Sequence, residues 1–507
     1  MTDGTLQIVR DETVYAAIAR RRTSDSLAIV DGNDSFSYRA LVKAVDALAG
    51  WLGDFAPRGQ AVGIYMDNSI EAVVAILAVM RVGRTVVPIN TKNDPRTVAF
   101  IADQAGIGAI LTSARNAARL TDMPPDVKVS VLDRGDWHDG AGDGPTVSAE
   151  MPNPALIFFT SGSTGKPKGV CVSHGNLVHG ADSVAQYLRV TEGLRMGAVL
   201  PLSFDAGLNW ILTGLACGAE VHLLRYVFPM SLASDLGRLR IQALLAVPTV
   251  FFALSEVPAA QNTSGIRMAS TGGRMHDATV RKLRGAYDRL EFTVMYGLTE
   301  AFRATYLPDA LWADNPSSIG RPIPHADVHI LDDEGQEAPV GQTGEIVQSG
   351  PLVSQGYANS PEQQMLRFGP TPSFSRFAET HPVSVYSGDE GYRDENGLLY
   401  FAGRKDRLIK SRGFRISPEE IEKEVAGKTS LESVVAFGED DMRFGQKIII
   451  VGEGVATGDI TIETVRRALR GGVPEYMLPD ELRWVDRFPI NANGKIDVPK
   501  TIKMVAV

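Results

Sequence analysis

A stretch of hydroxyl, glycine and lysine residues from Thr160 to Lys168 is the part of the sequence best suited to bind phosphate. It follows a short apolar run, residues 155–159, which is typical of a buried strand. Three glycines, the last at Gly169, let the backbone take positive φ and turn its N–H groups to one side, which creates a concavity that binds anions. We therefore predict a polyphosphate site. The residues expected to form it are Thr160, Ser161, Gly162, Ser163, Thr164, Gly165, Lys166 and Lys168.

Two known motifs of similar composition do not match this stretch. Pro167 stands where a Walker A loop requires Ser or Thr after its lysine. The pentapeptide centred on Ser163 begins with Ser161, whereas the nucleophile elbow of serine hydrolases begins with Gly. A flexible surface loop is the structural alternative, because clusters of Gly, Ser and Thr usually form loops. The ordered composition of the whole run favours the phosphate site.

The composition is that of a globular protein with more than one domain. A chain of 507 residues is too long for one ordinary core, and its contents of 44% hydrophobic and 22% charged residues are typical of globular proteins. The formal net charge of −9 gives no reason to expect nucleic acid or an anionic membrane as a partner. Cys171 and Cys217 are too few for a disulfide framework, which indicates a reducing, cytoplasmic location.

Neither a secretory signal nor a membrane span is expected. Residues 1–4 do not begin a basic region followed by an apolar core. The longest apolar stretch, residues 72–89, is interrupted by Arg81 and Arg84, so it favours a helix followed by a strand.

Helices and strands are predicted to alternate in the first part of the chain, which is typical of parallel strands covered by helices. The expected helices are residues 38–52, 69–82 and 94–104, and the expected strands are residues 61–65, 85–89 and 107–111. A Gly-, Asp- and Pro-rich segment, residues 133–151, is expected to be a surface loop before the phosphate strand, the strand at residues 155–159 that leads into the phosphate site.

Three later segments bring a strand to polar residues. Residues 198–205 lead to Asp205, residues 268–274 lead to a glycine turn, and residues 292–300 lead to Tyr-Gly-Leu-Thr-Glu. Asp277 is expected to be the N-cap of a helix over residues 278–287.

After about residue 315 the pattern changes to short strands and turns, such as residues 328–331 and 344–348, which predict an antiparallel β subdomain. Ser417-Pro418-Glu419-Glu420 predicts a helix start with a capping box. The predicted fold is α/β, with a large N-terminal domain of mixed parallel sheets and covering helices and a small α+β C-terminal domain. The expected bounds are 1–403 for the first, including a β subdomain at about 315–403, and 404–507 for the second.

Five motifs occur in the order found in the adenylate-forming superfamily, which the chain resembles over essentially its whole length. They are the phosphate loop and residues 296–300, 386–389, 403–415 and 491–495. This superfamily includes acyl-CoA synthetases, peptide-synthetase adenylation domains and luciferases. The resemblance implies that ATP and a carboxylic acid give an acyl-adenylate and pyrophosphate, and that a second nucleophile then attacks the adenylate.

The chemistry of the residues suits the nucleotide site that the resemblance implies. Glu300 is a hard oxygen ligand for Mg²⁺, and Thr299 would donate to the α-phosphate. Asp389 offers two acceptors for the ribose hydroxyls, and Arg404 would contact ribose or phosphate. The resemblance gives Thr160, Thr299, Glu300 and Lys495 catalytic roles and adds Gly272, Gly273, Arg274, Tyr296, Gly297 and Phe401 to the site, with Tyr296 stacking on adenine.

Lys495 lies in Asn-Gly-Lys, a tight turn that would present its tip. By resemblance, it neutralises charge on the carboxylate and α-phosphate while adenylate forms. Asp406 falls at the hinge of the family, at about residues 404–407, about which the small, mobile C-terminal domain rotates between the two half-reactions. Lys410, Arg412 and Gly413 would then face the acceptor channel.

A mostly apolar acyl pocket is expected, formed by Phe204, Asp205, Leu208, Trp210, Phe251, Gly297 and Leu298. By resemblance to amino-acid-activating relatives, Asp205 would pair with a substrate ammonium; a structural or capping role is the alternative. The histidines at 174, 179, 222 and 276 have no metal-ligand spacing and are expected to be structural.

No carrier-protein domain follows Lys495, so we expect a stand-alone enzyme. Residues 200–210, 271–275 and 295–308 resemble a bacterial subgroup of acyl-CoA ligases and coronafacate ligase-like amide synthetases. We favour transfer of the acyl group to an amino-acid amine; a thioester with CoA or a carrier-protein thiol is the alternative, which no motif excludes. A non-catalytic nucleotide-binding protein is a third hypothesis, although such a protein would be expected to lose Glu300 or Lys495.

Overall fold

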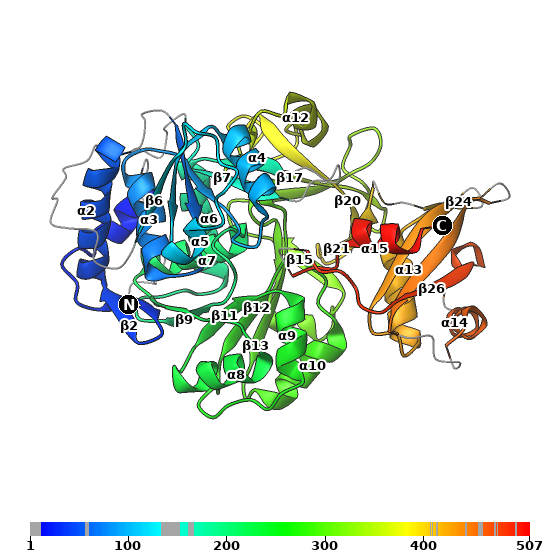
Figure 1. Cartoon of the computed structure of the whole chain (residues 1–507). Coiled ribbons are helices and arrows are strands. Elements are labelled where there is room, and N and C mark those ends of the chain that lie inside the picture. Colours follow the sequence, from blue (N-terminus) through cyan, green and yellow to red (C-terminus); the bar gives the residue numbers. More distant parts are fainter. Residues whose placement is uncertain are drawn as a thin grey trace. The chain divides into compact units, whose positions relative to one another are not determined.

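The computed structural model divides into two compact units. The first contains Met1–Val328 and Gln348–Val385, and the second contains His329–Val347 and Tyr386–Val507 (Figure 1). The predicted domain boundary at residues 403/404 remains a prediction. The structure describes residues 12–55, 60–132, 153–160, 167–405, 407, 409–411, 414–441, 444–454, 460–470, 473, 475–491 and 494–506.

The sheet that carries the phosphate strand has seven strands in the order β18-β8-β7-β4-β3-β5-β6. Strands β3 to β7 are parallel, whereas β8 is antiparallel to both of its neighbours, β7 and β18. The bounds are β3 Ala61–Tyr65, β4 Val86–Pro88, β5 Ile107–Thr112, β6 Lys128–Val131, β7 Leu156–Thr160, β8 Lys168–Val172 and β18 Gly356–Tyr357. Helices α2 Tyr38–Phe55, α3 Ile70–Arg81 and α4 Pro95–Ala105 precede β3, β4 and β5 in turn, which confirms the predicted alternation. The predicted loop at residues 133–151 lies outside the described residues.

A second run of strands in the first unit has the order β2-β1-β10-β9-β11-β12-β13-β14-β15, parallel from β1 to β13. The strands are β1 Leu27–Asp31, β2 Asp34–Ser37, β9 Arg195–Ala198, β10 Glu220–Leu223, β11 Ala243–Ala246, β12 Arg267–Ser270, β13 Glu291–Tyr296, β14 Thr305–Leu307 and β15 Ser318–Pro322. The helices that accompany them are α6 His174–Tyr187, α7 Asp205–Cys217, α8 Pro229–Arg238, α9 Pro248–Ser255 and α10 Asp277–Ala286.

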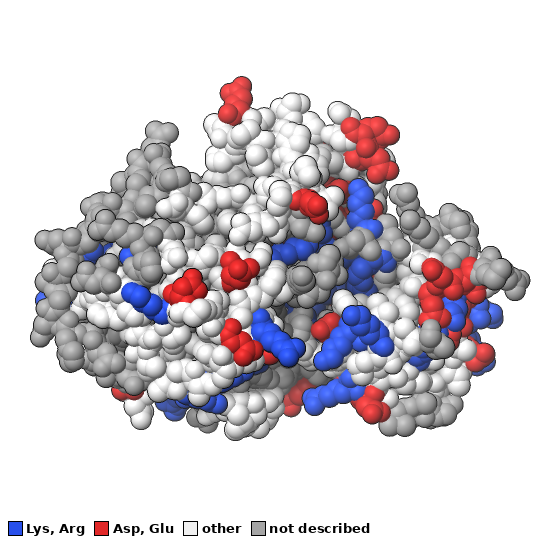
Figure 2. Space-filling model, turned by 45° about the horizontal axis from the view of Figure 1, so that its top comes forward, with Lys and Arg blue, Asp and Glu red and all other residues white. Residues whose placement is uncertain are grey.

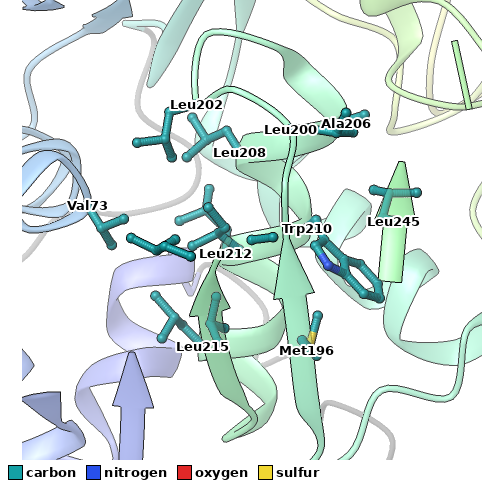
Figure 3. Packing of buried hydrophobic residues seen from close by; sticks show 14 of the residues in the cluster. Val73, Met196, Leu200, Leu202, Ala206, Leu208, Trp210, Leu212, Leu215 and Leu245 are labelled. Atoms are coloured by element: carbon teal, nitrogen blue, oxygen red, sulfur yellow. The ribbon is translucent and has the colours of Figure 1, made fainter. Parts of the chain in front are cut away.

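Helix α7 is buried along its entire length, as expected for a largely apolar helix surrounded by other elements, and its polar residues Asn209 and Thr213 are buried with it. Its side chains meet residues from α3, β9 and β11 in the main hydrophobic core (Figure 3). Trp210 is 2% exposed, and its indole N–H donates to the Gly197 carbonyl at 2.9 Å, so the one polar atom of this side chain is satisfied inside the core.

Two local predictions in this region were wrong. The strand expected directly before Asp205 lies earlier, in β9, because residues 199–204 form a connection held by Asn68, whose side chain bonds to Leu200 O and Leu202 N at 2.8 and 2.9 Å. Asp277 is the first residue of α10 and not its N-cap; its carboxylate pairs with Arg281 one turn later at 2.8 Å.

The second unit contains a five-stranded sheet in the order β23-β22-β25-β24, with β26 paired to β25. Alternate residues of β25 contribute to two different cores, Ile448 and Ile450 to one and Ile449 and Val451 to the other, so both faces of the sheet are covered. Helices α13 Pro418–Lys428 and α14 Ile462–Leu469 cover the first face, and α15 Val498–Val505 covers the second. The strands are β22 Ile409–Ser411, β23 Phe414–Ile416, β24 Val434–Asp441, β25 Gly445–Glu453 and β26 Glu481–Val485.

Four further strands have the order β16-β17-β20-β21, and the chain passes between the two units within β16, β17 and β20. They are β16 Asp327–Leu331, β17 Gly344–Ser349, β20 Val383–Arg393 and β21 Leu399–Arg404, in agreement with the predicted β segments. Ser417 accepts from Glu420 N at 3.3 Å, which confirms it as the N-cap of α13, but the described contacts contain no return bond from the Glu420 side chain that would complete the predicted capping box.

Side chains of both signs are interspersed on the face shown in Figure 2. Within the described residues, no helix is long and apolar enough to cross a membrane.

Candidate active site

The Tyr-Gly-Leu-Thr-Glu motif forms a close turn at the end of β13. Gly297 is required there, because a Cβ atom at this position would lie 2.4 Å from the Arg303 Cα atom. A short 3₁₀ helix, Thr299–Ala301, follows, and Phe302 then takes a positive φ of 59° that returns the chain as β14. The turn therefore places Thr299 and Glu300 directly beyond the carboxyl end of a parallel strand, where α/β folds commonly bind ligands.

Glu300 is half-buried and held by residues distant in sequence. Its Oε1 atom accepts a hydrogen bond of 2.5 Å from the Tyr357 hydroxyl, and its carbonyl accepts from Ser354 N at 2.8 Å. Gln348 fixes the following residues by donating to the carbonyls of Ala301 and Arg303 at 3.2 and 3.0 Å. A carboxylate fixed in this way presents a hard oxygen donor suited to Mg²⁺.

The phosphate loop is described only at its two ends. Thr160 closes β7 and Lys168 opens β8, and the two are paired residues of an antiparallel ladder, so their backbones are adjacent. The predicted contacts from residues 161–166 lie outside the described residues. The Lys168 ammonium lies 6.0 Å from the centre of the Tyr357 ring, so Tyr357 contacts both Lys168 and Glu300.

Sequence reasoning missed Tyr357. It follows Gly356, which has a φ of 103°, in a strand of only two residues paired to β8. A Gly-Tyr pair is common in loops, so no local signal linked this residue to Glu300.

The residues predicted to contact adenine lie at the same edge of the sheet as the Tyr-Gly-Leu-Thr-Glu turn. β12 and β13 are parallel, with Ser270 opposite Val294, so the glycine turn after β12 and Tyr296 at the end of β13 emerge side by side. Gly272 has a φ of 82°, which favours glycine, and Arg274 is exposed.

Several residues predicted for the acyl pocket belong to the core. Leu208, Trp210 and Phe251 are buried, and the rings of Phe251 and Phe292 meet edge to face at 5.1 Å. Phe204 occupies the N-cap position of α7, and Leu298 follows Gly297 in the turn. Which of these side chains contact the acyl group remains a prediction.

Asp205 is the first residue of α7, and its Oδ1 atom accepts a hydrogen bond of 2.7 Å from Ala206 N. This contact agrees with the structural alternative for Asp205 at the positive end of the helix.

A buried cation that sequence reasoning also missed lies beside α7. Arg303 is only 3% exposed, and it donates to the Asn209 side-chain oxygen at 2.8 Å and to the Ala206 carbonyl at 3.4 Å. The side of α7 that faces Arg303 is therefore polar in its first turns, whereas the acyl pocket was predicted to be mostly apolar.

The predicted ribose residues lie in the second unit. Asp389 on β20 is opposite Arg404 on β21, and the two side chains form an ion pair of 3.1 Å. Asp389 is 7% exposed, and Phe401 lies on the same strand as Arg404. The carboxylate and guanidinium expected to contact the nucleotide are therefore neighbours in the described structure.

Lys495 lies in a tight turn, as predicted. Asn491 N donates to Lys495 O at 2.8 Å, Lys495 N donates to the Asn491 side chain at 3.1 Å, and Gly494 has a φ of 78°. The Lys495 side chain is exposed. Lys410 lies on β22 opposite Arg415, whereas Asp406, Arg412 and Gly413 lie outside the described residues.

Of the four histidines predicted to be structural, His174 and His222 are buried and His179 is half-buried, whereas His276 is exposed. Burial lowers the pKa values of His174 and His179 to about 4, so both are neutral at pH 7. Burial also lowers the pKa of His222.

Two sheets with covering helices, followed by a smaller α+β unit, define the fold class of the adenylate-forming enzymes. Solved structures of this class match almost the whole chain. They include o-succinylbenzoate CoA synthetase (MenE) from Bacillus subtilis (TM-score 0.83, 23% identity, covering 98% of this chain and 99% of that one). Amide bond synthetase McbA from Marinactinospora thermotolerans has a TM-score of 0.83 at 22% identity, covering 97% of this chain and 100% of that one. MatB from Rhodopseudomonas palustris has a TM-score of 0.83 at 24% identity, covering 97% and 99%.

The family model described as AMP-binding enzyme matches residues 16–358, and the chain therefore belongs to the AMP-binding enzyme family. This confirms the superfamily predicted from the motifs. Bacitracin synthase 3 from Bacillus licheniformis is 28% identical over 501 residues, which are 96% of this chain and 8% of that protein. Phosphinothricin tripeptide synthetase PhsC from Streptomyces viridochromogenes is 31% identical over 498 residues, which are 94% of this chain and 44% of that protein. The chain thus spans less than half the length of these curated relatives.

Proposed function

We propose that the chain is an AMP-forming ligase that activates a carboxylic acid with ATP and Mg²⁺ and transfers the acyl group to an amino-acid amine. The observation that carries the first half is the grouping of Thr160, Lys168 and Glu300 in one unit, with Tyr357 contacting both charged side chains. Hydroxyl, ammonium and carboxylate groups brought together at the ends of strands suit a metal-bound triphosphate.

Each of these groups has a role in the proposed adenylation. When bound at Glu300, Mg²⁺ would neutralise charge on the phosphate oxygens and orient them. Thr160, Thr299 and Lys168 would hold phosphate oxygens, and Lys495 would neutralise charge shared by the substrate carboxylate and the α-phosphate. A carboxylate oxygen bonds to the α-phosphorus as the bond to pyrophosphate breaks. Preorganised charges of this kind are commonly the largest contribution to catalysis.

The second part of the proposal concerns the acceptor, the nucleophile that attacks the adenylate in the second half-reaction. Structural likeness to an amide bond synthetase supports an amine, whereas equal likeness to a CoA synthetase supports a thiol as the second candidate. Lys410, Arg412 and Gly413 are proposed to face the acceptor after rotation about Asp406.

Pyrophosphate release tests adenylation. The chain is incubated with ATP, Mg²⁺ and a panel of carboxylic acids, and matched reactions omit the acid or contain EDTA. We expect release that depends on both the acid and the metal. Release with no acid in the panel above the acid-free rate would favour a non-catalytic nucleotide-binding protein.

A competition experiment tests the acceptor. One reactive acid is supplied with ATP, CoA and an L-amino acid at equal concentrations, and the products are identified by mass. We expect the N-acyl amino acid as the main product, with apolar amino acids preferred over charged ones. Acyl-CoA as the main product would establish the thioester alternative.

A further inference from the structure

Residues 348–358 form hydrogen bonds both to the turn that carries Glu300 and to β8, the strand that follows the phosphate loop. The segment is itself fixed to helix α6, because the Asn176 side chain donates to the carbonyls of Pro351 and Val353 at 2.7 and 2.9 Å. Further backbone bonds, each of 2.8 Å, run from Ser354 N to Glu300 O, from Gln355 N to Cys171 O and from Ala358 N to Gly169 O. The segment therefore fixes β8 and the Glu300 turn relative to each other.

The Tyr357 side chain contacts charged groups of both elements. Its hydroxyl donates to Glu300 Oε1 at 2.5 Å, the short distance expected when a carboxylate accepts from an O–H group. Its ring centre lies 6.0 Å from the Lys168 ammonium, within the range of a cation–π contact.

The tyrosine is held in this position from two sides. Its ring packs edge to face against Phe368 at 5.5 Å, and its backbone N–H donates to the Gln364 side chain at 2.9 Å. A donor fixed in this way restricts the rotation of the Glu300 side chain, so less rotamer freedom remains to be lost when the carboxylate binds a metal. Because the phenol has one proton to donate, it bonds to one carboxylate oxygen.

We propose that Tyr357 is a positioning residue that orders the Glu300 carboxylate for the metal–nucleotide complex and keeps Lys168 beside it. This inference rests on the proposed function, in which Glu300 holds Mg²⁺. Tyr357 acts through Glu300 and contributes no ligand of its own. Groups that orient a metal ligand typically change metal affinity by about 10–100-fold when they are removed.

The test is the Tyr357→Phe variant, which keeps the ring against Phe368 and Lys168 and removes only the hydroxyl. Binding of a non-hydrolysable ATP analogue is measured by calorimetry across a Mg²⁺ titration and again in EDTA. We expect the Mg²⁺ concentration for half-maximal binding to rise about 10-fold or more. Binding in EDTA and the melting temperature without ligand should stay close to those of the wild type.

Tyr400→Phe is the matched control, because it also removes a phenol–carboxylate hydrogen bond, to Asp394 at 3.2 Å in the second unit. It should leave the Mg²⁺ dependence unchanged. The sharper comparison uses Glu300→Gln, because a residue that acts through Glu300 should have little further effect once that carboxylate is gone. Equal losses from Tyr357→Phe in the Glu300→Gln and wild-type backgrounds would overturn the positioning role.

The possible failures are distinguishable. If the wild type binds the analogue in a Mg²⁺-dependent way and Tyr357→Phe is unchanged, the positioning role is wrong and the proposed function stands. If the wild type binds without dependence on Mg²⁺, both the metal role of Glu300 and the positioning role are wrong.

Discussion

Two turns carry charged residues of the candidate site, and they are held in different ways. Glu300 is fixed by Tyr357, which is 57 residues away in sequence, while the neighbouring Ala301 carbonyl accepts from Gln348, 47 residues from it. The Lys495 turn is shaped by bonds to Asn491, four residues away. The position of Glu300 is thus a property of the whole first unit, whereas the shape of the Lys495 turn is a property of a short segment, which the proposed domain rotation would leave intact.

Lys495→Ala should have the largest effect. We expect acyl-adenylate formation to fall roughly 10²–10³-fold, because one preorganised charge is lost. Reaction of a supplied acyl-adenylate with the acceptor should change much less, since the proposed rotation removes Lys495 from that step. Both half-reactions are measured separately, with Lys503→Ala as an exposed lysine control on α15. Equal losses in the two half-reactions would contradict the rotation.

Gly297→Ala tests the long-range packing of the Glu300 turn. The added Cβ would lie 2.4 Å from the Arg303 Cα atom, so the backbone of the turn must shift. We expect roughly 10²-fold slower adenylation, the scale of a displacement of about 1 Å. The free energy of unfolding should fall by about 1–3 kcal/mol.

Gly285→Ala is the matched control for this variant, because a Cβ in that helix would meet no atom within 4 Å. Alanine should raise the free energy of unfolding there by about 0.5–1 kcal/mol. Wild-type activity in Gly297→Ala would show that the turn tolerates movement.

Gly494→Ala should affect the Lys495 turn alone. Its φ of 78° disfavours alanine by about 1–2 kcal/mol, so the turn should open for part of the time. We expect adenylation to fall by roughly 5–30-fold, the equilibrium equivalent of that free energy. Gly427→Ala in α13, where a Cβ meets no atom within 4 Å, should leave activity unchanged. A loss as large as that of Lys495→Ala would mean that the turn does not form without glycine.

The smallest effect concerns the response of the two units to acid. His174 and His179 have pKa values of about 4, below the ordinary 6.5, because burial disfavours their charged forms. The unfolded chain therefore binds more protons between pH 6.5 and 4, and the stability of the first unit should fall as the pH decreases through that range. Glu439 in the second unit has a pKa lowered to about 2 by hydrogen bonds from Arg483 and Lys447, so its contribution is lost only below about pH 4.5.

Melting temperatures at pH 7 and pH 5 test this difference. We expect a decrease at pH 5 that is smaller in His179→Leu than in the wild type, because the variant has one fewer buried histidine. An equal decrease in both proteins would mean that His179 does not determine the acid response.

Local signals predicted the elements, and long-range contacts decided the site. The alternation over residues 38–111 and the Ser417 cap depend on neighbouring residues, and both were predictable. The contact of Tyr357 with Glu300 and the burial of Arg303 beside α7 depend on the packing of segments far apart in the chain. No spacing in the sequence encodes such pairs, so the motif residues were predictable whereas the side chains that hold them were not.

With the proposed acyl pocket, the burial of α7 would link the choice of acid substrate to the folding of the chain. The helix carries Leu208 and Trp210, proposed for the acyl pocket, yet all its residues are buried, and a Cβ at Gly207 would lie 2.4 Å from the Pro201 carbonyl oxygen. A substitution that reshapes the pocket from this helix also alters core packing, at a typical cost of 1–3 kcal/mol for added volume. New acid specificities should therefore evolve more readily through the connecting segments at the strand ends than through α7, or only after other substitutions have first raised the stability of the first unit.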